Sequence, residues 1–252
     1  MSCPNVSFYV LDKDACIRSV SQFFDDSNLP FGRFQNYIAS NFSFDLKHLE
    51  SLSQEQRRSE IYLLLESVYN AKFDQMQKAK SDVENLFNES KDEIFSILEG
   101  VFKVSLEGKS IKAGVMFNQV CPRYLNELAF EIYYGASAEY NLQTCIHEII
   151  HFFYFEKWKK VFTNYDEKTF ENPHLIWLLS EISIDAIFKC TGLKKFLTDN
   201  MPAYHHFYNA SINGKPILLT FKNLFENNSI ENYFKKAMDY IYENKNFFKK
   251  LT

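Results

Sequence analysis

The chain has 252 residues, of which 46% are hydrophobic and 24% are charged, and this globular composition excludes fibrous and largely disordered classes. Aromatic residues make up 17%, against only 7 Gly and 6 Pro, which favours long helices over a many-stranded barrel or sandwich. The net charge is −4, so there is no basic excess to neutralise a phosphate backbone, and we expect no nucleic-acid partner.

The first predicted elements occupy two zones. Over residues 54–100, apolar side chains recur at steps of three and four, which predicts one or two amphipathic helices. The period then changes, because residues 101–106, 111–117 and 128–134 are short aliphatic and aromatic runs typical of strands. The first two runs flank Glu107-Gly108-Lys109 and are predicted to form a hairpin.

After residue 142 the helical period returns. It continues to a final amphipathic stretch that places one set of side chains on a single face: Ile230, Phe234, Ala237, Ile241 and Tyr242. Helices, a small sheet and then helices predict a mostly helical α+β protein with a small mixed sheet. We expect an N-terminal helical region over residues 1–100 and a second region over residues 101–252, within one compact unit.

Cysteine usage and the N-terminal sequence bear on the cellular compartment. The chain has five Cys, an odd number without a C-x-x-C pair, which indicates reduced thiols. Asp12, Lys13 and Asp14 lie where a signal peptide would be apolar, and no apolar run approaches the roughly 20 residues of a membrane helix. We therefore expect a cytoplasmic protein without a membrane partner, and the sequence leaves its oligomeric state open.

One motif stands out, His147-Glu148-Ile149-Ile150-His151, in a segment without Gly or Pro. On a helix, side chains four residues apart share a face, so both imidazoles can bind one Zn²⁺. Glu148, about 100° round the helix, can reach a metal-activated water instead of the metal. With so few His, the pattern arises by chance with an expectation of about 0.01. The alternative is a buried helix with two incidental histidines.

A catalytic zinc needs a third protein ligand and an open position. Asn172 and Pro173 are a favourable helix start and Gly192 a favourable stop, so a helix is predicted between them. If this helix is antiparallel to the motif helix, a rise of about 1.5 Å per residue brings Glu181 level with the two histidines. Asp185, one turn further on the same face, is placed to hydrogen-bond the free ring nitrogen of a ligating histidine.

Together, His147-Glu148-x-x-His151 and Glu181-x-x-x-Asp185 resemble the active site of the gluzincin (thermolysin-like) zinc metallopeptidases. The small size is similar to that of compact bacterial members, although the spacing from His151 to Glu181 is longer than in the best-known ones. The resemblance spans residues 101–189. It implies a zincin-like catalytic region over residues 101–252, with one Zn²⁺ per chain.

By the same resemblance, His147, His151 and Glu181 would bind the zinc, Glu148 would be the general base and acid, and Asp185 would orient a ligand. Family members often use a downstream Tyr or His to stabilise the oxyanion. Four such residues follow Met201-Pro202, and the sequence does not distinguish among them: Tyr204, His205, His206 and Tyr208. The alternative for this cluster is an aromatic loop packed on the C-terminal helix.

The leading hypothesis is a zinc-dependent peptidase that hydrolyses a peptide or protein substrate with metal-activated water, the proton passing through Glu148. A second hypothesis is a catalytically silent, peptidase-like zinc protein that acts as a regulator or binding module. A third is a helical protein whose histidine pair binds no metal.

Overall fold

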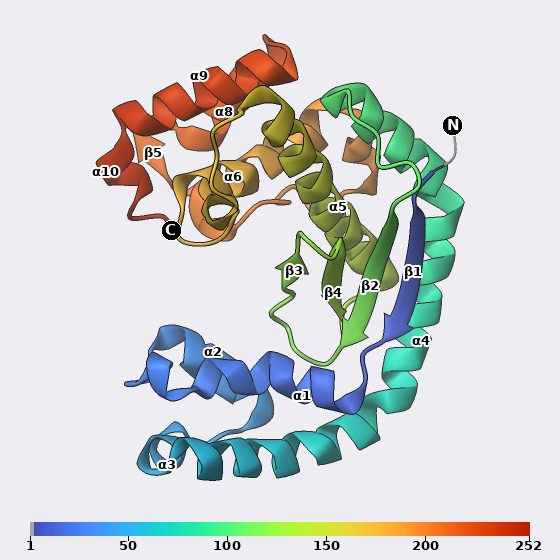
Figure 1. Cartoon of the computed structure of the whole chain (residues 1–252), viewed down its shortest axis with the longest axis vertical. Helices are drawn as coiled ribbons and strands as arrows, with labels where there is room; N and C mark the ends of the chain where they lie inside the picture. The colour runs from blue at the N-terminus through green and yellow to red at the C-terminus, as the bar shows by residue number, and fades with distance from the viewer. Residues whose placement is uncertain (1–2) are drawn as a thin grey trace. The chain divides into compact units, whose positions relative to one another are not determined.

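A computed structural model describes residues 3–252 (Figure 1). The protein is a mostly helical α+β protein with a four-stranded mixed sheet and a two-stranded sheet, so the expected fold class is confirmed. Its contacts group into two units that interleave along the chain. The sheet unit comprises residues 6–85 and 110–141, and the helical unit comprises residues 86–109 and 142–252 with the described residues up to Asn5. The division that we expected at residue 100 stays a prediction.

The sheet unit is organised around four strands in the order β1-β2-β4-β3 (Figure 1). Their bounds are β1 Asn5–Val10, β2 Ser110–Met116, β3 Arg123–Tyr124 and β4 Ala129–Tyr133. β2 and β4 are parallel, with Gly114 opposite Glu131, whereas β3 is antiparallel to β4. Because side chains alternate along a strand, buried Ile111, Ala113 and Val115 lie on the opposite face from Glu131. One face of β2 is therefore buried along the strand, whereas the other is buried only in its second half, from Gly114 onward.

Glu131 is an unusual side chain for the interior of a sheet. It is only 7% exposed, and Tyr124 donates a hydrogen bond of 3.2 Å to its Oε1. Its Oε2 has no hydrogen-bond partner among the residues that the structure describes. Burial raises the pKa of this carboxyl from 4.5 to about 7, and the hydrogen bond from Tyr124 opposes only part of that rise.

Several short helices complete the sheet unit, together with the first part of one long helix. They are α1 Lys13–Ser21, the 3₁₀ turns η1 Gln22–Phe24 and η2 Asp26–Asn28, α2 Arg33–Phe42, α3 Leu46–Ser51 and α4 Gln54–Phe102. The α1 helix is capped by Asp12, whose side chain accepts from the N–H of Ala15.

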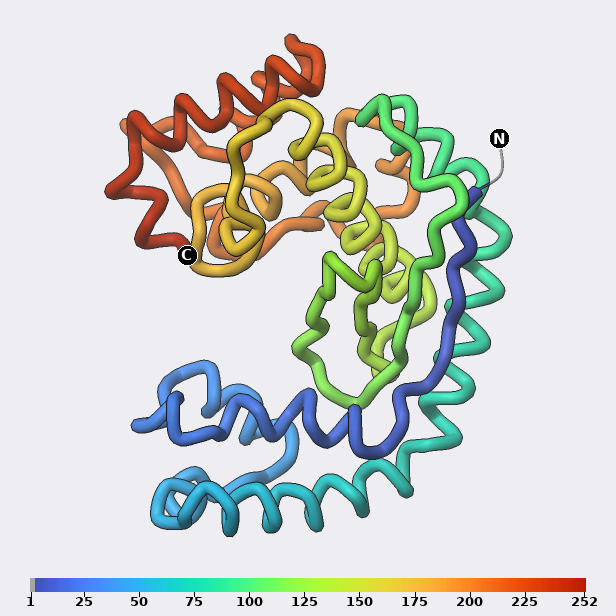
Figure 2. The backbone as a smooth tube through the Cα atoms, viewed as in Figure 1, coloured from blue at the N-terminus to red at the C-terminus, as the bar shows by residue number. Residues whose placement is uncertain are grey.

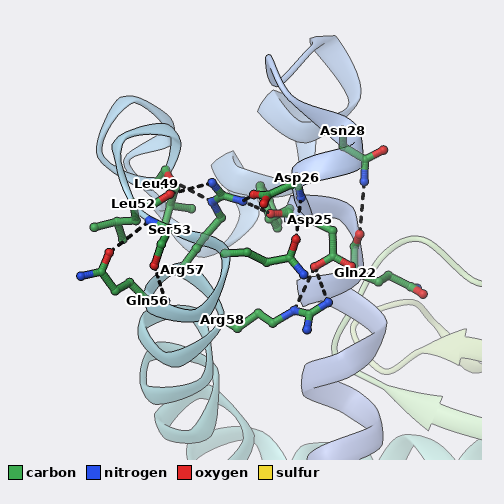
Figure 3. A network of polar contacts seen from close by, with 12 residues as sticks. Gln22, Asp25, Asp26, Asn28, Leu49, Leu52, Ser53, Gln56, Arg57 and Arg58 are labelled. Carbon is green, nitrogen blue, oxygen red and sulfur yellow. Dashed lines mark hydrogen bonds and ion pairs between the residues drawn. The ribbon is translucent and has the colours of Figure 1, made fainter.

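Arg57, at the start of α4, joins these segments (Figure 3). Its guanidinium is buried and donates to three backbone carbonyls, those of Phe24, Leu49 and Leu52, at 2.8, 2.8 and 2.9 Å. It also donates to the Asp26 carboxylate at 3.0 Å. One planar cation thus satisfies carbonyl groups from η1, the end of α3 and the following turn, which no ammonium group could do with the same geometry.

The helical unit contains the remaining elements. They are α5 Ala138–Val161, which starts in the sheet unit, η3 Glu167–Phe170, α6 Leu175–Cys190, η4 Gly192–Phe196, α7 His205–Tyr208, β5 Ser211–Ile212, β6 Lys215–Pro216, α8 Ile217–Glu226, α9 Ile230–Glu243 and α10 Lys245–Phe248. The α6 helix is central, because every residue from Leu178 to Phe188 is buried and the helix packs against α8 and α9. Figure 2 shows the backbone turning from α8 into α9 and then α10.

Aromatic side chains fill the interior between α5 and its neighbours. Phe153 on α5 contacts Phe95 and Phe102 of α4, with ring centroids 6.1 and 6.0 Å apart. Tyr154 contacts Phe234 of α9 at 4.6 Å and stacks on Trp158. All six side chains are buried, and each such pair adds about 0.5–1.5 kcal/mol beyond the effect of the area that it removes from water.

The strand predictions are partly right. Residues 111–117 and 128–134 correspond to β2 and β4, but residues 101–106 do not form a strand. The α4 helix continues to Phe102, and the chain leaves it through Lys103, which has a φ of 54°. The expected hairpin is therefore wrong, and β2 pairs with β4 and, unexpectedly, lies beside β1.

The helix predictions hold with two corrections. Residues 54–100 form the single helix α4, and the motif helix is α5. The next helix does not start at Pro173: it begins at Leu175, after His174, whose N–H donates to the carbonyl of Glu171. On α9, the expected apolar face is buried except for Tyr242, which is 56% exposed.

Two further expectations concern cysteines and membrane spans. The five cysteines all lie in the described part of the chain and form no disulfide there, and Cys16 and Cys145 are buried. Within residues 3–252, no helix has the length and apolar character that crossing a membrane requires.

Candidate metal centre

Two turns of α5 hold the motif in the expected arrangement. His147 and His151 lie one above the other on the helix, with ring centroids 4.9 Å apart and Nε2 atoms 3.1 Å apart. The His151 side chain is fully buried, whereas that of His147 is 20% exposed. The pair therefore has one ring in the protein interior and one ring that solvent can reach.

Glu181 on α6 meets this pair, as the helical rise predicts. Its Oε2 lies 3.3 Å from Nε2 of His147 and 3.4 Å from Nε2 of His151, and its side chain is 4% exposed. Among the residues that the structure describes, these three form the one group of His, Cys, Asp or Glu side chains close enough together to hold a metal ion.

The three atoms fit a zinc ion. Tetrahedral zinc with bonds of about 2.0–2.2 Å separates its ligand atoms by about 3.3–3.5 Å. The observed separations of 3.1, 3.3 and 3.4 Å are close to that triangle. Three atoms with lone pairs repel each other at such distances unless something positive lies among them. A proton bridges two of them, whereas a metal ion can bind all three and keep a fourth position open.

The electrostatics of Glu181 are consistent with a bound cation. Burial alone would raise the pKa of its carboxyl, but the neighbouring rings of His151 and His147 outweigh this and hold the pKa well below its usual range. The carboxylate is therefore ionised in an interior where an unpaired charge would be very unfavourable. Two imidazoles and one carboxylate are a donor set that zinc accepts.

A backbone carbonyl orients His147. Its Nδ1 lies 3.3 Å from the carbonyl oxygen of Pro202. Since a carbonyl can only accept, Nδ1 carries a hydrogen, and Nε2 is the ring nitrogen that can bind a metal.

Glu148 follows His147 directly on α5 and is buried. About 100° of helix rotation separates it from its neighbour, so its carboxylate is offset from the face that carries the two rings. That offset is the arrangement expected for a group beside the metal centre that is not itself a ligand.

Asp185 is buried on α6, one turn beyond Glu181. We expected it to accept from a histidine ring, but its Oδ1 accepts instead from the hydroxyl of Tyr208 and from Nζ of Lys189, both at 2.6 Å. The ring of His147 has the Pro202 carbonyl as its partner. Asp185 thus lies one turn from Glu181, and its hydrogen bonds go to Tyr208 and Lys189.

The four candidate oxyanion donors lie on α7 and its N-cap. Tyr208 is half-buried and donates to Asp185, and burial and that hydrogen bond raise the pKa of its hydroxyl. Tyr204, His205 and His206 are exposed, and the Tyr204 ring stacks on His206 with centroids 5.8 Å apart. The sequence predicts that these four side chains are candidates for the site. It does not predict that the backbone carbonyl of Pro202 contacts His147, because every residue has a backbone carbonyl.

Comparisons of the chain with protein-family models, with curated proteins and with solved structures found no match. The case for a function therefore depends on the residues and their geometry.

Proposed function

We propose that the protein is a zinc-dependent peptidase. The observation that carries the proposal is the triangle formed by His147 Nε2, His151 Nε2 and Glu181 Oε2, with sides of 3.1–3.4 Å. His147, His151 and Glu181 would hold one Zn²⁺ per chain. When bound, zinc supplies Lewis-acid activation of water and of a substrate carbonyl group.

The chain's own residues would provide the proton transfer. Glu148 would accept the proton of the attacking water and pass it to the leaving amine, so that one carboxylate serves as base and then as acid. Substrate would reach the metal from the side of His147, because that side chain is partly exposed, whereas the His151 side chain is fully buried. The substrate would be a peptide or protein, since the net charge of −4 gives no support for a nucleic acid.

The test exchanges one atom of Glu148. Glu148→Gln keeps the shape of the side chain but removes its capacity to accept a proton, so hydrolysis of a peptide library should fall at least about a hundredfold. Zinc content, measured by elemental analysis, should remain at one per chain. The matched control is Glu139→Gln, which makes the same change at an exposed position of α5 and should leave the rate unaltered. Full activity of a clean Glu148→Gln preparation would overturn the assignment of Glu148.

A second candidate function is a silent zinc protein with a regulatory or binding role. The hydrogen bond from Tyr208 to Asp185 favours this function. While the Tyr208 hydroxyl donates to Asp185, it cannot donate to the oxyanion that forms during peptide hydrolysis. The two candidates differ in one measurement. Stoichiometric zinc with no cleavage of a broad peptide library would favour the silent protein over the peptidase.

A further inference from the structure

One peptide group links the candidate metal centre to the loop before α7. The carbonyl of Pro202 accepts from Nδ1 of His147 at 3.3 Å, and the N–H of the same peptide group, on Ala203, donates to Oη of Tyr208 at 3.3 Å. A peptide group is planar, so fixing its N–H also fixes the direction of its carbonyl. Pro202 and Ala203 are buried, so water has little access to the peptide group that joins them.

The chain of contacts continues from Tyr208 to a charged group. The Tyr208 hydroxyl donates to Oδ1 of Asp185 at 2.6 Å. Asp185 is 3% exposed, and Lys189, whose Nζ also lies 2.6 Å from Oδ1 and 5.0 Å from the centre of the Tyr208 ring, balances its charge. Burial and the hydrogen bond to Asp185 raise the pKa of Tyr208, so the hydroxyl keeps its proton at neutral pH.

All the hydrogen bonds in this path run in one direction. Each group donates to the next, from the His147 ring through the Pro202–Ala203 peptide and Tyr208 to the carboxylate of Asp185. The Pro202 carbonyl and the Asp185 carboxylate can only accept hydrogen bonds, and the N–H of Ala203 can only donate one. The direction of each hydrogen bond in the path is therefore fixed. Hydrogen bonds arranged in this way polarise one another and strengthen together.

We propose that Tyr208 is a positioning residue that connects Asp185 to His147 through the Pro202–Ala203 peptide, and so holds the His147 ring with Nδ1 on the Pro202 carbonyl and Nε2 directed at His151 and Glu181. Asp185 then acts on the histidine ring through two intermediate groups. The effect on zinc affinity rests on the proposed function. The orientation of the His147 ring does not, because the hydrogen bond from Nδ1 to the Pro202 carbonyl is present in the chain without metal.

The test is Tyr208→Phe, which keeps the ring and removes only the hydroxyl. In the metal-free protein labelled with ¹⁵N histidine, the ¹H resonance of Nδ1–H on His147 should move upfield or broaden, because its acceptor, the Pro202 carbonyl, is no longer held in place. Zinc affinity, measured by competition with a chelator, should fall about tenfold, as for other groups that orient a ligand. A loss of global stability alone would not move this resonance.

The matched control is Tyr242→Phe, which makes the same change at an exposed position of α9 outside the path. It should leave both measurements unchanged. The proposal is overturned if the Nδ1–H resonance of Tyr208→Phe is that of wild type and its zinc affinity is within about twofold of wild type. If Tyr208→Phe does not fold, the spectrum of wild-type His147 decides, since a ring without a hydrogen on Nδ1 contradicts the proposal. Absence of zinc binding in wild type would count against the peptidase, and the NMR result would still stand.

Discussion

Nε2 of His151 lies 3.4 Å from Oε2 of Glu181, and both side chains are almost completely removed from solvent. A carboxylate in such a place needs a positive partner, and the protonated ring or a metal ion can provide one. If the partner is zinc, replacing Glu181 changes metal affinity directly.

We expect Glu181→Gln to lower zinc affinity by at least about a hundredfold, because even groups that only orient a ligand are worth ten- to a hundredfold. The amide keeps the volume of the side chain and loses its charge. Chelator competition measures the affinity, and Glu171→Gln, at an exposed position before α6, is the control. Wild-type affinity in Glu181→Gln would show that Glu181 is not a ligand.

Zinc should stabilise the folded chain. A ligand that binds only the folded state at a concentration about a hundred times its Kd adds about 2.7 kcal/mol. Thermal unfolding followed by circular dichroism should therefore shift to higher temperature when zinc is added to the metal-free protein, and EDTA should reverse the shift. The His147→Ala/His151→Ala double variant should show no shift, and a wild-type response from it would place the zinc elsewhere.

Glu131 should make the stability of the protein depend on pH. Its pKa is raised in the folded state, from 4.5 to about 7, so the folded chain holds this proton more tightly than the unfolded chain. The contribution of Glu131 to stability is therefore complete below pH 4.5 and is lost as the pH rises through 7. The total change is at most about 3 kcal/mol.

The measurement compares urea unfolding of wild type and Glu131→Gln at pH 5 and pH 8. The amide cannot ionise, so the variant should gain stability relative to wild type at the higher pH. The nearby Tyr9, Tyr124 and Cys16 all have raised pKa values, that of Cys16 about 12, and do not titrate in this range. Glu127→Gln, exposed on the loop before β4, should show no such crossover. An equal difference at both pH values would contradict the prediction.

Arg57→Met should destabilise the sheet unit by about 3–5 kcal/mol, because the backbone carbonyls of Phe24, Leu49 and Leu52 lose their donor and a buried carbonyl left unsatisfied costs about 1–3 kcal/mol. Arg57→Lys should recover only part of this loss, since an ammonium group lacks the planar fork. Chemical denaturation measures both. Arg58→Met is the control, because Arg58 is exposed and makes its ion pair with Asp25 at the surface. If Arg58→Met lowers the free energy of unfolding as much as Arg57→Met does, the hydrogen bonds of Arg57 do not explain its effect.

The long helices and the grouping of His147, His151 and Glu181 could be predicted from sequence because both depend on the helical period. The step from His147 to His151 and the rise to Glu181 follow from helix geometry alone. Residues 101–106 could not be predicted in the same way. Phe102, Val104 and Leu106 alternate and are all buried, as in a strand, but the first of them ends α4 and the others lie in irregular chain. Alternating apolar residues indicate that alternate side chains are buried, but they do not determine the backbone conformation.

The strand β1 is difficult to predict from the sequence for a related reason. Only Phe8 of its six residues is buried, so there is no alternating pattern to find. The path from Asp185 to His147 also cannot be predicted from the sequence, because two of its hydrogen bonds involve backbone groups of Pro202 and Ala203. Backbone groups are the same at every position, and only the fold decides where they point.

The candidate ligand set has a consequence for charge. Two neutral imidazoles and one carboxylate bring a single negative charge to a divalent ion, so the occupied centre would keep a net charge of +1. A set of thiolates would cancel that charge or invert it. The centre would therefore attract anionic groups, and small molecules that pair a carboxylate or hydroxamate with a short peptide should bind the zinc-loaded protein in preference to their neutral amides.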